Sequence, residues 1–309
     1  MQHKGNILLP IFNEEQSIIE LISEIELYIK ELNIDFVVTL VDDGSRDKSW
    51  EIIEKLESEY LSFRRIKLTR NFGHQPAIFA GLENFKEDFV IILDADFQDD
   101  PKYLTKFINM WDQGHKIVLA KKVKRKDKRF RRFLTKFYFR IQSKLSQINI
   151  PQDVGHFCLL DKLIVSELNN MPEKNKFLLG LRTYVGFESA YVEVTKNKRK
   201  YGSSKMSLFQ LINLSIEGII GFSTVPLNLI GVIGIFISMG ALLFSFYTLI
   251  LNVAFNTEVG SWDFGLTSIY FLSGIQLLSI SIIGQYVSKI FHETKKRPSY
   301  IVEKKISDN

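Results

Sequence analysis

The sequence predicts an α/β fold with a mostly parallel sheet and helices on both faces, followed by two hydrophobic segments. In the amino-terminal third, short apolar runs alternate with longer segments of helical spacing, which is typical of such sheets. Further along, the chain is uncharged from Gly218 to Thr257 and again from Phe264 to Ser288. Each run exceeds the roughly 20 apolar residues that span a bilayer. We therefore expect a globular domain joined to a membrane hairpin.

The globular part is predicted to begin with four strands and three helices in alternation. The strands are Asn6–Ile11, Phe36–Val41, Arg64–Leu68 and Phe89–Leu93, and the helices are Glu14–Leu32, Ser49–Tyr60 and Gln75–Phe85. Ligands of parallel sheets bind beyond the carboxyl ends of the strands. Polar residues that follow these strands are therefore the first candidates for a site.

A polar cluster follows each of the four strands. The clusters are Pro10-Ile11-Phe12-Asn13-Glu14-Glu15, Asp42-Asp43-Gly44-Ser45, Arg70-Asn71-Phe72-Gly73-His74 and Asp94–Asp100. Asp94 and Asp96 are two residues apart on an extended segment, so their carboxylates point the same way and can reach one divalent cation. Oxygen ligands suit Mg²⁺ or Mn²⁺ shared with substrate phosphates. A solvated loop is the alternative for this pair alone, and the convergence of four clusters favours the metal–diphosphate site.

Several polar residues near these clusters have two readings. His74 and His156 are either metal ligands or acid–base groups, or they are structural hydrogen-bonding residues. Asp99 and Asp100 precede Pro101 and either cap the next helix or belong to the site. Asp42-Asp43 before Gly44 can form a turn alone, but its place after a strand favours a functional role.

The charges beside the hydrophobic segments predict their orientation. Basic residues flank both segments, whereas the connector between them carries only the acids Glu258 and Asp263. The positive-inside rule then places both flanks and both termini in the cytoplasm. The predicted parts are a cytoplasmic domain 1–206, an interfacial amphipathic helix 207–224, membrane helices 225–251 and 264–289, an external connector 252–263, and a cytoplasmic basic tail 290–309.

Composition narrows the partners and the compartment. The net charge of +5 suits a protein that lies against anionic lipid, and two membrane segments argue against nucleic acid. The single cysteine, Cys158, fits a reducing compartment. The basic run Lys121–Arg132 either is a solvated surface or binds lipid phosphate. Gly231, Gly234 and Gly240 allow close helix packing and hence a homo-oligomer.

The ordered motifs resemble the inverting family 2 glycosyltransferases, and in particular the polyprenyl-phosphate glycosyltransferases. These include dolichyl-phosphate mannosyltransferase-like enzymes and bacterial undecaprenyl-phosphate glucosyltransferases. Besides the four clusters, the resemblance rests on Asp153-Val154-Gly155-His156-Phe157, Arg199-Lys200-Tyr201-Gly202-Ser203-Ser204-Lys205, Gly284-Gln285-Tyr286 and Arg297-Pro298-Ser299-Tyr300. It covers nearly the whole chain. It implies the GT-A fold and a bacterial cytoplasmic-membrane enzyme.

The resemblance also implies roles for individual residues. Asp94, Asp96 and Gln98 match the metal-binding motif, and Pro10, Phe12, Glu14 and Asp42 match the part that binds the nucleoside of the donor. Arg199 and Lys205 match basic residues that close over the diphosphate, Arg131 and Thr135 match residues that hold the acceptor phosphate, and Asp153 matches a carboxylate near the acceptor. Asp96, Asp153, Arg199 and Lys205 are therefore the predicted catalytic residues.

Two segments depart from the family pattern. The usual Gly-Asp-Phe-Arg is here Gly155-His156-Phe157-Cys158, which lacks an acid and an arginine. The common Gly-Glu-Tyr is here Gly284-Gln285-Tyr286. The first change puts contacts with the acceptor or the sugar in doubt.

These residues predict transfer of a hexose from a nucleotide-diphosphate sugar, UDP-glucose or a UDP-N-acetylhexosamine, to undecaprenyl phosphate for cell-envelope glycosylation. A divalent metal stabilises the leaving diphosphate. A lipid monophosphate is mostly dianionic at neutral pH, so it can attack without a general base, and Asp153 is the candidate if one is needed. The alternatives are a processive polysaccharide synthase and a non-catalytic membrane scaffold or sugar sensor on the same fold.

Overall fold

A computed structural model describes residues 3–30, 32–123, 151, 153–174, 176–195, 225–255 and 262–308. The described residues fall into two compact units. An α/β unit comprises the described residues up to 195 together with 296–308, and a helical unit comprises 225–255 and 262–295. Each unit is described by itself.

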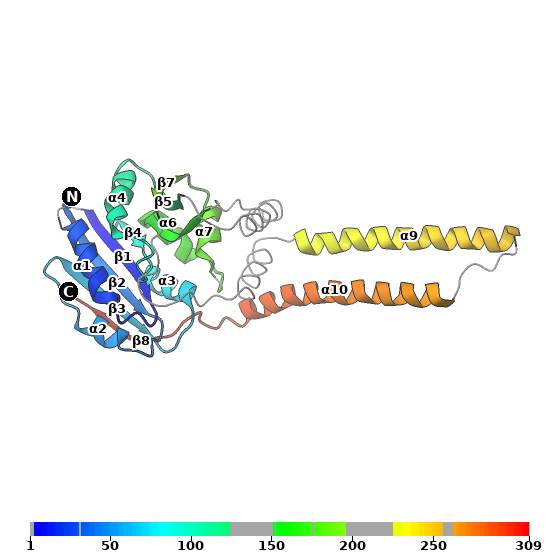
Figure 1. The fold of residues 1–309 in the computed structure, drawn as a ribbon, viewed down its shortest axis with the longest axis horizontal. Helices are drawn as coiled ribbons and strands as arrows, with labels where there is room; N and C mark the ends of the chain where they lie inside the picture. The colour runs from blue at the N-terminus through cyan, green and yellow to red at the C-terminus, as the bar shows by residue number, and fades with distance from the viewer. Residues whose placement is uncertain are drawn as a thin grey trace. The chain divides into compact units, whose positions relative to one another are not determined.

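The α/β unit is built on an eight-stranded mixed sheet (Figure 1) with the strand order β7-β5-β6-β4-β1-β2-β3-β8. The strands are β1 (His3–Ile11), β2 (Ile34–Asp42), β3 (Leu61–Leu68), β4 (Phe89–Ile92), β5 (Ile117–Lys122), β6 (Val154–Asp161), β7 (Ser189–Val194) and β8 (Val302–Ser307). Strands β4, β1, β2 and β3 are parallel neighbours, whereas β6 and β8 run antiparallel to theirs. The carboxyl ends of β1 to β4 therefore lie at one edge of the sheet.

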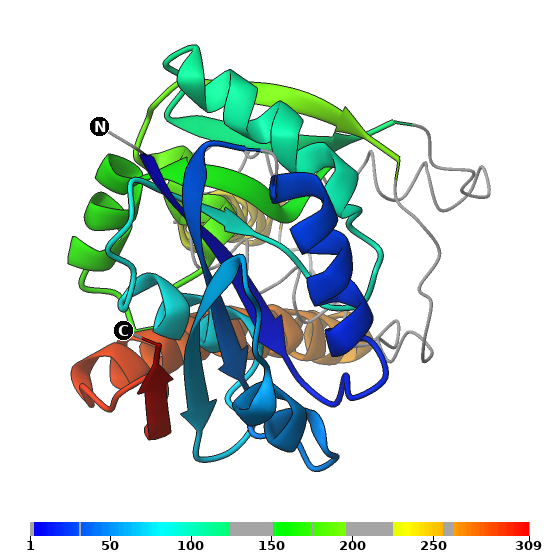
Figure 2. The same ribbon diagram turned by 90° about the vertical axis from the view of Figure 1, so that its left-hand side faces the viewer.

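Helices cover both faces of the sheet (Figure 2). They are α1 (Ile18–Ile29), α2 (Ser49–Lys55), α3 (His74–Leu82), α4 (Leu104–Asp112), α6 (Lys162–Asn170) and α7 (Leu178–Tyr184), with a short 3₁₀ helix at Pro101–Tyr103. The main hydrophobic core joins α1, α2 and α4 to alternate strand residues such as Ile7 and Leu9. Leu8 points to the other face, where α3 packs so closely that a Cβ on Gly81 would lie 2.1 Å from Leu8 Cδ1. Helices α6 and α7 pack on β6.

All four predicted strands and all three predicted helices are present in the predicted order, but all three helices are shorter than the sequence indicates, and α3 ends at Leu82 and not at Phe85. Helix α1 begins at Ile18 and not at Glu14, because residues 14–17 form a turn in which the Ser17 amide donates to the Glu14 carbonyl over 3.0 Å. Helix α2 ends at Lys55. The Arg65 side chain donates to the carbonyls of Ile53 and Leu56, so it satisfies the end of that helix.

The carboxyl-terminal segment, for which the sequence predicted only a basic tail, contributes a strand to the sheet. Strand β8 pairs with β3, so that Arg64 lies opposite Ser307 and Arg65 opposite Ile306. Beyond the strand, the Asp308 carboxylate accepts a hydrogen bond from the Phe63 amide over 2.9 Å and pairs with Arg65. Strand β8 thereby covers the edge of β3, which would otherwise expose unpaired backbone groups.

The helical unit contains α9 (Val225–Phe255) and α10 (Trp262–Thr294). Within the described residues, one stretch, Phe271–Thr294, is long and apolar enough by length and composition to cross a membrane, and Leu227–Ala241 is a shorter apolar stretch. Large apolar side chains on both helices, such as Phe236 and Leu277, are more than 60% exposed, as expected of a surface that faces lipid or another protein. The paired membrane spans stay a prediction. The predicted interfacial helix 207–224 lies outside the described residues.

A buried polar cluster ties β1, β2 and β3 to the loop before β4. The Arg64 guanidinium donates to Glu87 over 2.8 Å and to Thr39 over 3.3 Å, and the Asn6 amide donates to both of those residues. Burial raises the pKa of the Glu87 carboxyl, but hydrogen bonds from Arg64 and the Lys86 amide outweigh it, and the net pKa is lowered. Every member of the cluster has a partner, so the buried charges are compensated.

We expect Arg64→Met to destabilise the protein by about 3–5 kcal/mol, because it leaves the buried Glu87 carboxylate without its cation. Denaturant unfolding followed by tryptophan fluorescence measures the change. The double variant Arg64→Met/Glu87→Leu should recover much of the loss. As a matched control, Glu303→Gln, which breaks the exposed pair with Lys67, should cost less than about 1 kcal/mol. An equal effect of both single variants would contradict the role of burial.

Candidate active site

The polar clusters that follow β1 and β2 are held together by reciprocal hydrogen bonds. The Asn13 amide donates to Ser45 Oγ over 3.0 Å, and the Arg46 amide donates back to Asn13 Oδ1 over 2.8 Å. The Glu14 amide donates to Ser49 Oγ over 2.9 Å. Asn13 has a positive φ of 56°, a conformation that asparagine tolerates better than most residues. The two loops therefore form one preorganised wall.

Among the residues predicted to bind the nucleoside, Pro10 is buried in β1, Phe12 is 38% exposed and Glu14 is partly exposed. Phe12 and Glu14 lie on this wall. Asp42, at the end of β2, is fully buried and accepts hydrogen bonds from the Ser45 amide at 3.3 Å. Burial raises the pKa of its carboxyl despite those hydrogen bonds. In this structure Asp42 organises the turn that carries Ser45.

Asp43 joins the second cluster to the third. Its two carboxylate oxygens accept hydrogen bonds from the amides of Phe72 and Gly73, at 2.7 and 2.9 Å. Burial raises the pKa of this carboxyl, and the two amides act in the opposite direction. The Asp43 bonds fix the backbone directly before His74, the first residue of α3. The orientation of α3 at the rim therefore depends on the end of β2.

The predicted metal motif follows β4 and alternates in burial. Asp94, Asp96 and Gln98 are partly exposed, whereas Ala95 and Phe97 between them are buried. Phe97 has a φ of 59° and enters the main core. Gln98 donates to Asp96 through its backbone amide over 3.1 Å and through its side-chain amide. The side-chain nitrogen of Gln98 therefore faces Asp96, and its metal-ligating role stays a prediction.

Two histidines surround Asp94. His74 Nε2 lies 2.9 Å from Asp94 Oδ1, and the His74 and His156 rings are 4.8 Å apart between centroids. Burial lowers the pKa of His74, but its hydrogen bond to Asp94 and the charges of neighbouring acids outweigh this, so the net pKa is raised. Burial and the positive charges of His74 and Arg182 lower the pKa of His156 to about 4. His156 is therefore neutral at physiological pH.

The pairing of β6 with β4 brings His156 to this position. Cys158 lies opposite Ile92 in an antiparallel ladder, so two residues further along, His156 comes opposite Asp94 on the same face. Gln75 fixes the imidazole, because its side-chain nitrogen is 2.6 Å from His156 Nε2 while its side-chain oxygen accepts from the Leu178 amide over 3.0 Å. This placement depends on the order of strands, which no local motif reveals.

The donor groups at the rim fit a divalent metal. One ligand atom each from His74, Asp94 and His156 lie within 4.8 Å of one another. Two ligands on one ion lie at most about 4.2 Å apart, twice a typical metal–ligand bond, so a small movement would bring the three together. Asp96 is also partly exposed, but residues 95 and 96 form a turn and not the extended segment that the sequence predicted, so the expectation that both carboxylates point the same way does not follow from strand geometry here. Oxygen and imidazole donors together suit Mn²⁺ as well as Mg²⁺.

The remaining predicted residues divide into described and undescribed ones. Asp153 is exposed, has a φ of 62°, and receives a hydrogen bond at its backbone carbonyl from the Lys122 amide over 3.0 Å. Asp100 caps the 3₁₀ helix by accepting from the Lys102 amide, which confirms the capping interpretation for that residue. Arg131, Thr135, Arg199 and Lys205 lie outside the described residues.

Sequence reasoning gave no role to Arg182, which the structure places beside the site. Arg182 lies on α7 and is only 2% exposed. Its positive charge lowers the pKa of His156, and it lies beside Cys158, whose thiol pKa is raised by burial. The sequence signal was faint, since an arginine in an otherwise apolar short helix resembles an ordinary surface residue.

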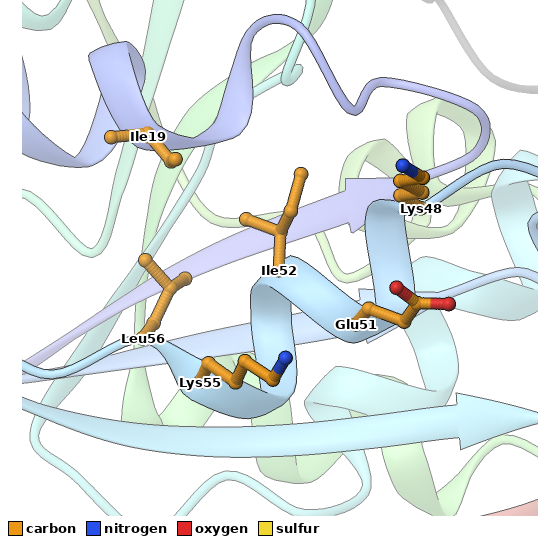
Figure 3. Close-up of a pocket in the computed structure, with 6 residues that line it drawn as sticks. All are labelled: Ile19, Lys48, Glu51, Ile52, Lys55 and Leu56. Carbon is orange, nitrogen blue, oxygen red and sulfur yellow. The ribbon is translucent and has the colours of Figure 1, made fainter.

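A separate depression lies between α1 and α2 (Figure 3). Its volume is about 280 Å³, and it is lined by Ile19, Lys48, Glu51, Ile52, Lys55 and Leu56. None of the predicted site residues lines it. Its lining is mostly apolar with flexible charged side chains at the margin, and it offers no convergent set of reactive groups.

Comparison with known proteins identifies relatives over nearly the full length. The model of the family described as "Glycosyl transferase family 2" matches residues 6–168. An uncharacterized glycosyltransferase of Bacillus subtilis, YkcC, is 34% identical over 97% of this chain and 93% of its own length. A protein of Shigella phage SfX named bactoprenol glucosyl transferase is 33% identical over 97% of this chain and 99% of its own.

A solved structure is similar in fold. Glucosyl-3-phosphoglycerate synthase from Mycobacterium tuberculosis, crystallised with Mn²⁺, UDP and phosphoglyceric acid, superposes with a TM-score of 0.50. It is 16% identical and covers 71% of this chain and 76% of its own. The mixed α/β sheet of this chain is consistent with the GT-A fold that the sequence predicted.

We expect Asp43→Asn to lower stability by about 1–3 kcal/mol, because an amide retains one acceptor oxygen and leaves one buried backbone N–H unpaired. Because these bonds position the start of α3, donor affinity should fall as well. Denaturant unfolding and calorimetric titration of UDP measure the two effects. Glu51→Gln, on the exposed side of α2, is the control and should change neither. Unchanged stability of Asp43→Asn would contradict this role of the carboxylate.

Proposed function

This chain belongs to glycosyl transferase family 2, and from this we propose that it transfers a hexose from a nucleotide-diphosphate sugar to undecaprenyl phosphate. One observation carries the proposal. The similarity to the phage protein named bactoprenol glucosyl transferase extends over 97% of this chain, and so includes the apolar helices as well as the α/β unit. Similarity confined to the α/β unit would support only a transferase of unspecified acceptor.

The apolar helices support a lipid acceptor. A polyprenyl phosphate keeps its chain in the bilayer and presents its phosphate at the surface, so an enzyme that uses it gains from an anchor of its own. Helix α10 contains a stretch long and apolar enough to cross a membrane. We propose that this stretch and α9 form the predicted hairpin in the bacterial cytoplasmic membrane, with the catalytic unit on the cytoplasmic side.

The rim supports binding of a nucleotide sugar. The wall formed by the loops after β1 and β2 presents Phe12 as a partly exposed ring for the base, while Glu14 and the turn at Ser45 supply polar groups for the ribose. UDP-glucose is the proposed donor and a UDP-N-acetylhexosamine the alternative. The Mycobacterium tuberculosis synthase of similar fold was crystallised with UDP, which supports uracil over guanine.

We propose that Asp94 and Asp96 hold Mg²⁺ or Mn²⁺ at the diphosphate. When bound, the metal withdraws charge from the leaving diphosphate as a Lewis acid. The hydrogen bonds from Gln98 would hold the Asp96 carboxylate in place, and His74 would do the same for Asp94. Preorganised groups of this kind lower the reorganisation needed as charge develops.

The acceptor needs orientation more than activation. A phosphate monoester has a second pKa near 6 and is largely dianionic at neutral pH, so no side chain has to remove a proton before it attacks. The difficulty is to bring two anions together. We propose that Arg131 and Thr135 hold the acceptor phosphate and that Arg199 and Lys205 close over the diphosphate.

The alternatives each lack support from a specific observation. A processive synthase is expected to carry more membrane segments than the two predicted here. A non-catalytic scaffold would have no need of the carboxylates and histidines that gather at the rim. A homo-oligomer through the glycine-containing part of α9 is compatible with either function.

We expect the purified full chain, reconstituted with undecaprenyl phosphate and Mn²⁺, to release UDP from UDP-glucose or a UDP-N-acetylhexosamine only when the lipid is present. Asp96→Asn should reduce this turnover by at least 100-fold, because several kcal/mol of transition-state stabilisation depend on the metal. Coupled UDP detection across a panel of donors measures both. Absence of lipid-dependent release with every donor would contradict the proposal.

We expect Asp153→Asn to retain turnover within about threefold, because the acceptor phosphate is already ionised. The measurement is the initial rate at saturating donor and lipid over pH 6–9. Loss of activity by more than 100-fold, with normal UDP binding, would instead identify Asp153 as an essential base.

A further inference from the structure

We propose that Arg182 is a buried receptor for a substrate phosphate, reached from the rim past His156. Two facts carry this inference. The guanidinium is enclosed in the protein, and no oxygen or nitrogen acceptor pairs with it among the described residues. The ligand classes considered rest on the proposed function, whereas the evidence for a receptor comes from the side chain itself.

The Arg182 guanidinium lacks partners within the part of the chain that the structure describes. Nε, Nη1 and Nη2 are all buried, and none donates a hydrogen bond to an oxygen or nitrogen acceptor. Its neighbour is the buried thiol of Cys158, and sulfur is a weak acceptor. Asp94 and Asp99 act electrostatically on the same thiol, but neither accepts a hydrogen bond from Arg182.

The other two arginines that are buried among the described residues donate to oxygen acceptors, which makes Arg182 unusual. Arg64 donates to Glu87 and Thr39. Arg65 donates to the Ile53 carbonyl over 2.9 Å and pairs with Asp308. The fold therefore satisfies buried guanidinium groups where they serve structure. An enclosed guanidinium without oxygen acceptors is destabilising, and a local loss of stability of this kind is typical of functional sites.

The local sequence explains why the cation is unpaired. In the family pattern Gly-Asp-Phe-Arg, an acid and an arginine stand on β6. In this chain the acid is replaced by His156, which burial keeps neutral, and the arginine is replaced by Cys158. Arg182 approaches Cys158 from α7 and so places a cation next to the position that lacks one. No carboxylate accepts a hydrogen bond from it among the described residues, so its donors remain available to a ligand.

A phosphate fits this receptor best. The planar guanidinium fork matches two phosphate oxygens and binds them more strongly than a point charge does. His156, one of the three potential metal ligands, is close enough to Arg182 for the guanidinium charge to lower its pKa. Two sources of phosphate meet there under the proposed function, namely the donor diphosphate and the lipid monophosphate. Both present the same chemistry to Arg182.

The test uses the full chain in nanodiscs and compares Arg182→Met with Arg64→Met. Methionine keeps the apolar volume and removes the charge. For Arg182→Met we expect the melting temperature without ligand to rise by a few degrees, because an uncompensated charge is removed. Arg64→Met should lower it. Changes in melting temperature of opposite sign for the two variants would distinguish a phosphate receptor from a structural cation.

Ligand binding completes the test and separates the two sources. Calorimetric titrations with UDP in the presence of Mn²⁺, with farnesyl phosphate, and with uncharged farnesol are compared between the parent and the variants. We expect Arg182→Met to lose at least tenfold in affinity for one of the two phosphates, while farnesol binding is unchanged. A loss of affinity for UDP would identify the donor diphosphate as the ligand of Arg182. A loss of affinity for farnesyl phosphate would identify the acceptor phosphate as its ligand.

Arg182→Lys is the control for a folding defect, because lysine keeps the positive charge and removes only the planar guanidinium fork. It should lose at least threefold in affinity for the same phosphate. Affinities within twofold of the parent for both phosphates in both variants would overturn the inference, whatever the melting temperatures. A parent protein that binds neither phosphate would contradict the proposed function and the inference together.

Discussion

The rim of the sheet depends on the buried carboxylate of Asp43. Strand β2 carries it to the sheet edge, and there it accepts two backbone amides from the loop that follows β3. Without those donors a carboxylate that is 3% exposed would be strongly destabilising. With them, the loop must pass close to the end of β2, so α3 starts at His74 and His74 reaches Asp94. One hydrogen-bonded acid thus sets the spacing between three of the four polar clusters.

Strand β6 supplies the second constraint. Because it runs antiparallel between β4 and β5, its amino-terminal end lies at the same edge as the carboxyl ends of the parallel strands. His156 therefore joins the site from the opposite chain direction, and Gln75 couples it to the start of α7. Helix α7 in turn carries Arg182. The antiparallel pairing of β6 with β4 thus fixes the position of site residues that lie mostly in loops.

The sequence predicted the parts of this site that follow strands, because apolar runs and the polar residues after them are local signals. Asp42, Asp43, Asp94 and Asp96 were found in this way. The sequence suggested His156 as a possible metal ligand but did not indicate where it lies, since its position opposite Asp94 depends on the order of strands in the sheet. Strand β8 was missed because its residues are mostly charged and exposed, like those of a solvated tail. Its pairing with β3 joins segments that are far apart in the sequence.

The rim balances its charges in three different ways, and the difference bears on chemistry. Asp43 is stabilised by backbone amides, Asp94 interacts with the imidazole of His74, and Arg182 has no oxygen or nitrogen partner among the described residues. Groups of the first kind build the scaffold, because their partners cannot leave. The proposed transfer of a sugar from a diphosphate to a lipid phosphate brings two phosphate groups together and so needs groups of the last kind, because only a cation without an oxygen partner can give its full hydrogen-bonding capacity to an incoming anion. Burying such a cation destabilises the free protein, and binding of the anion restores that stability. The difference favours formation of the complex.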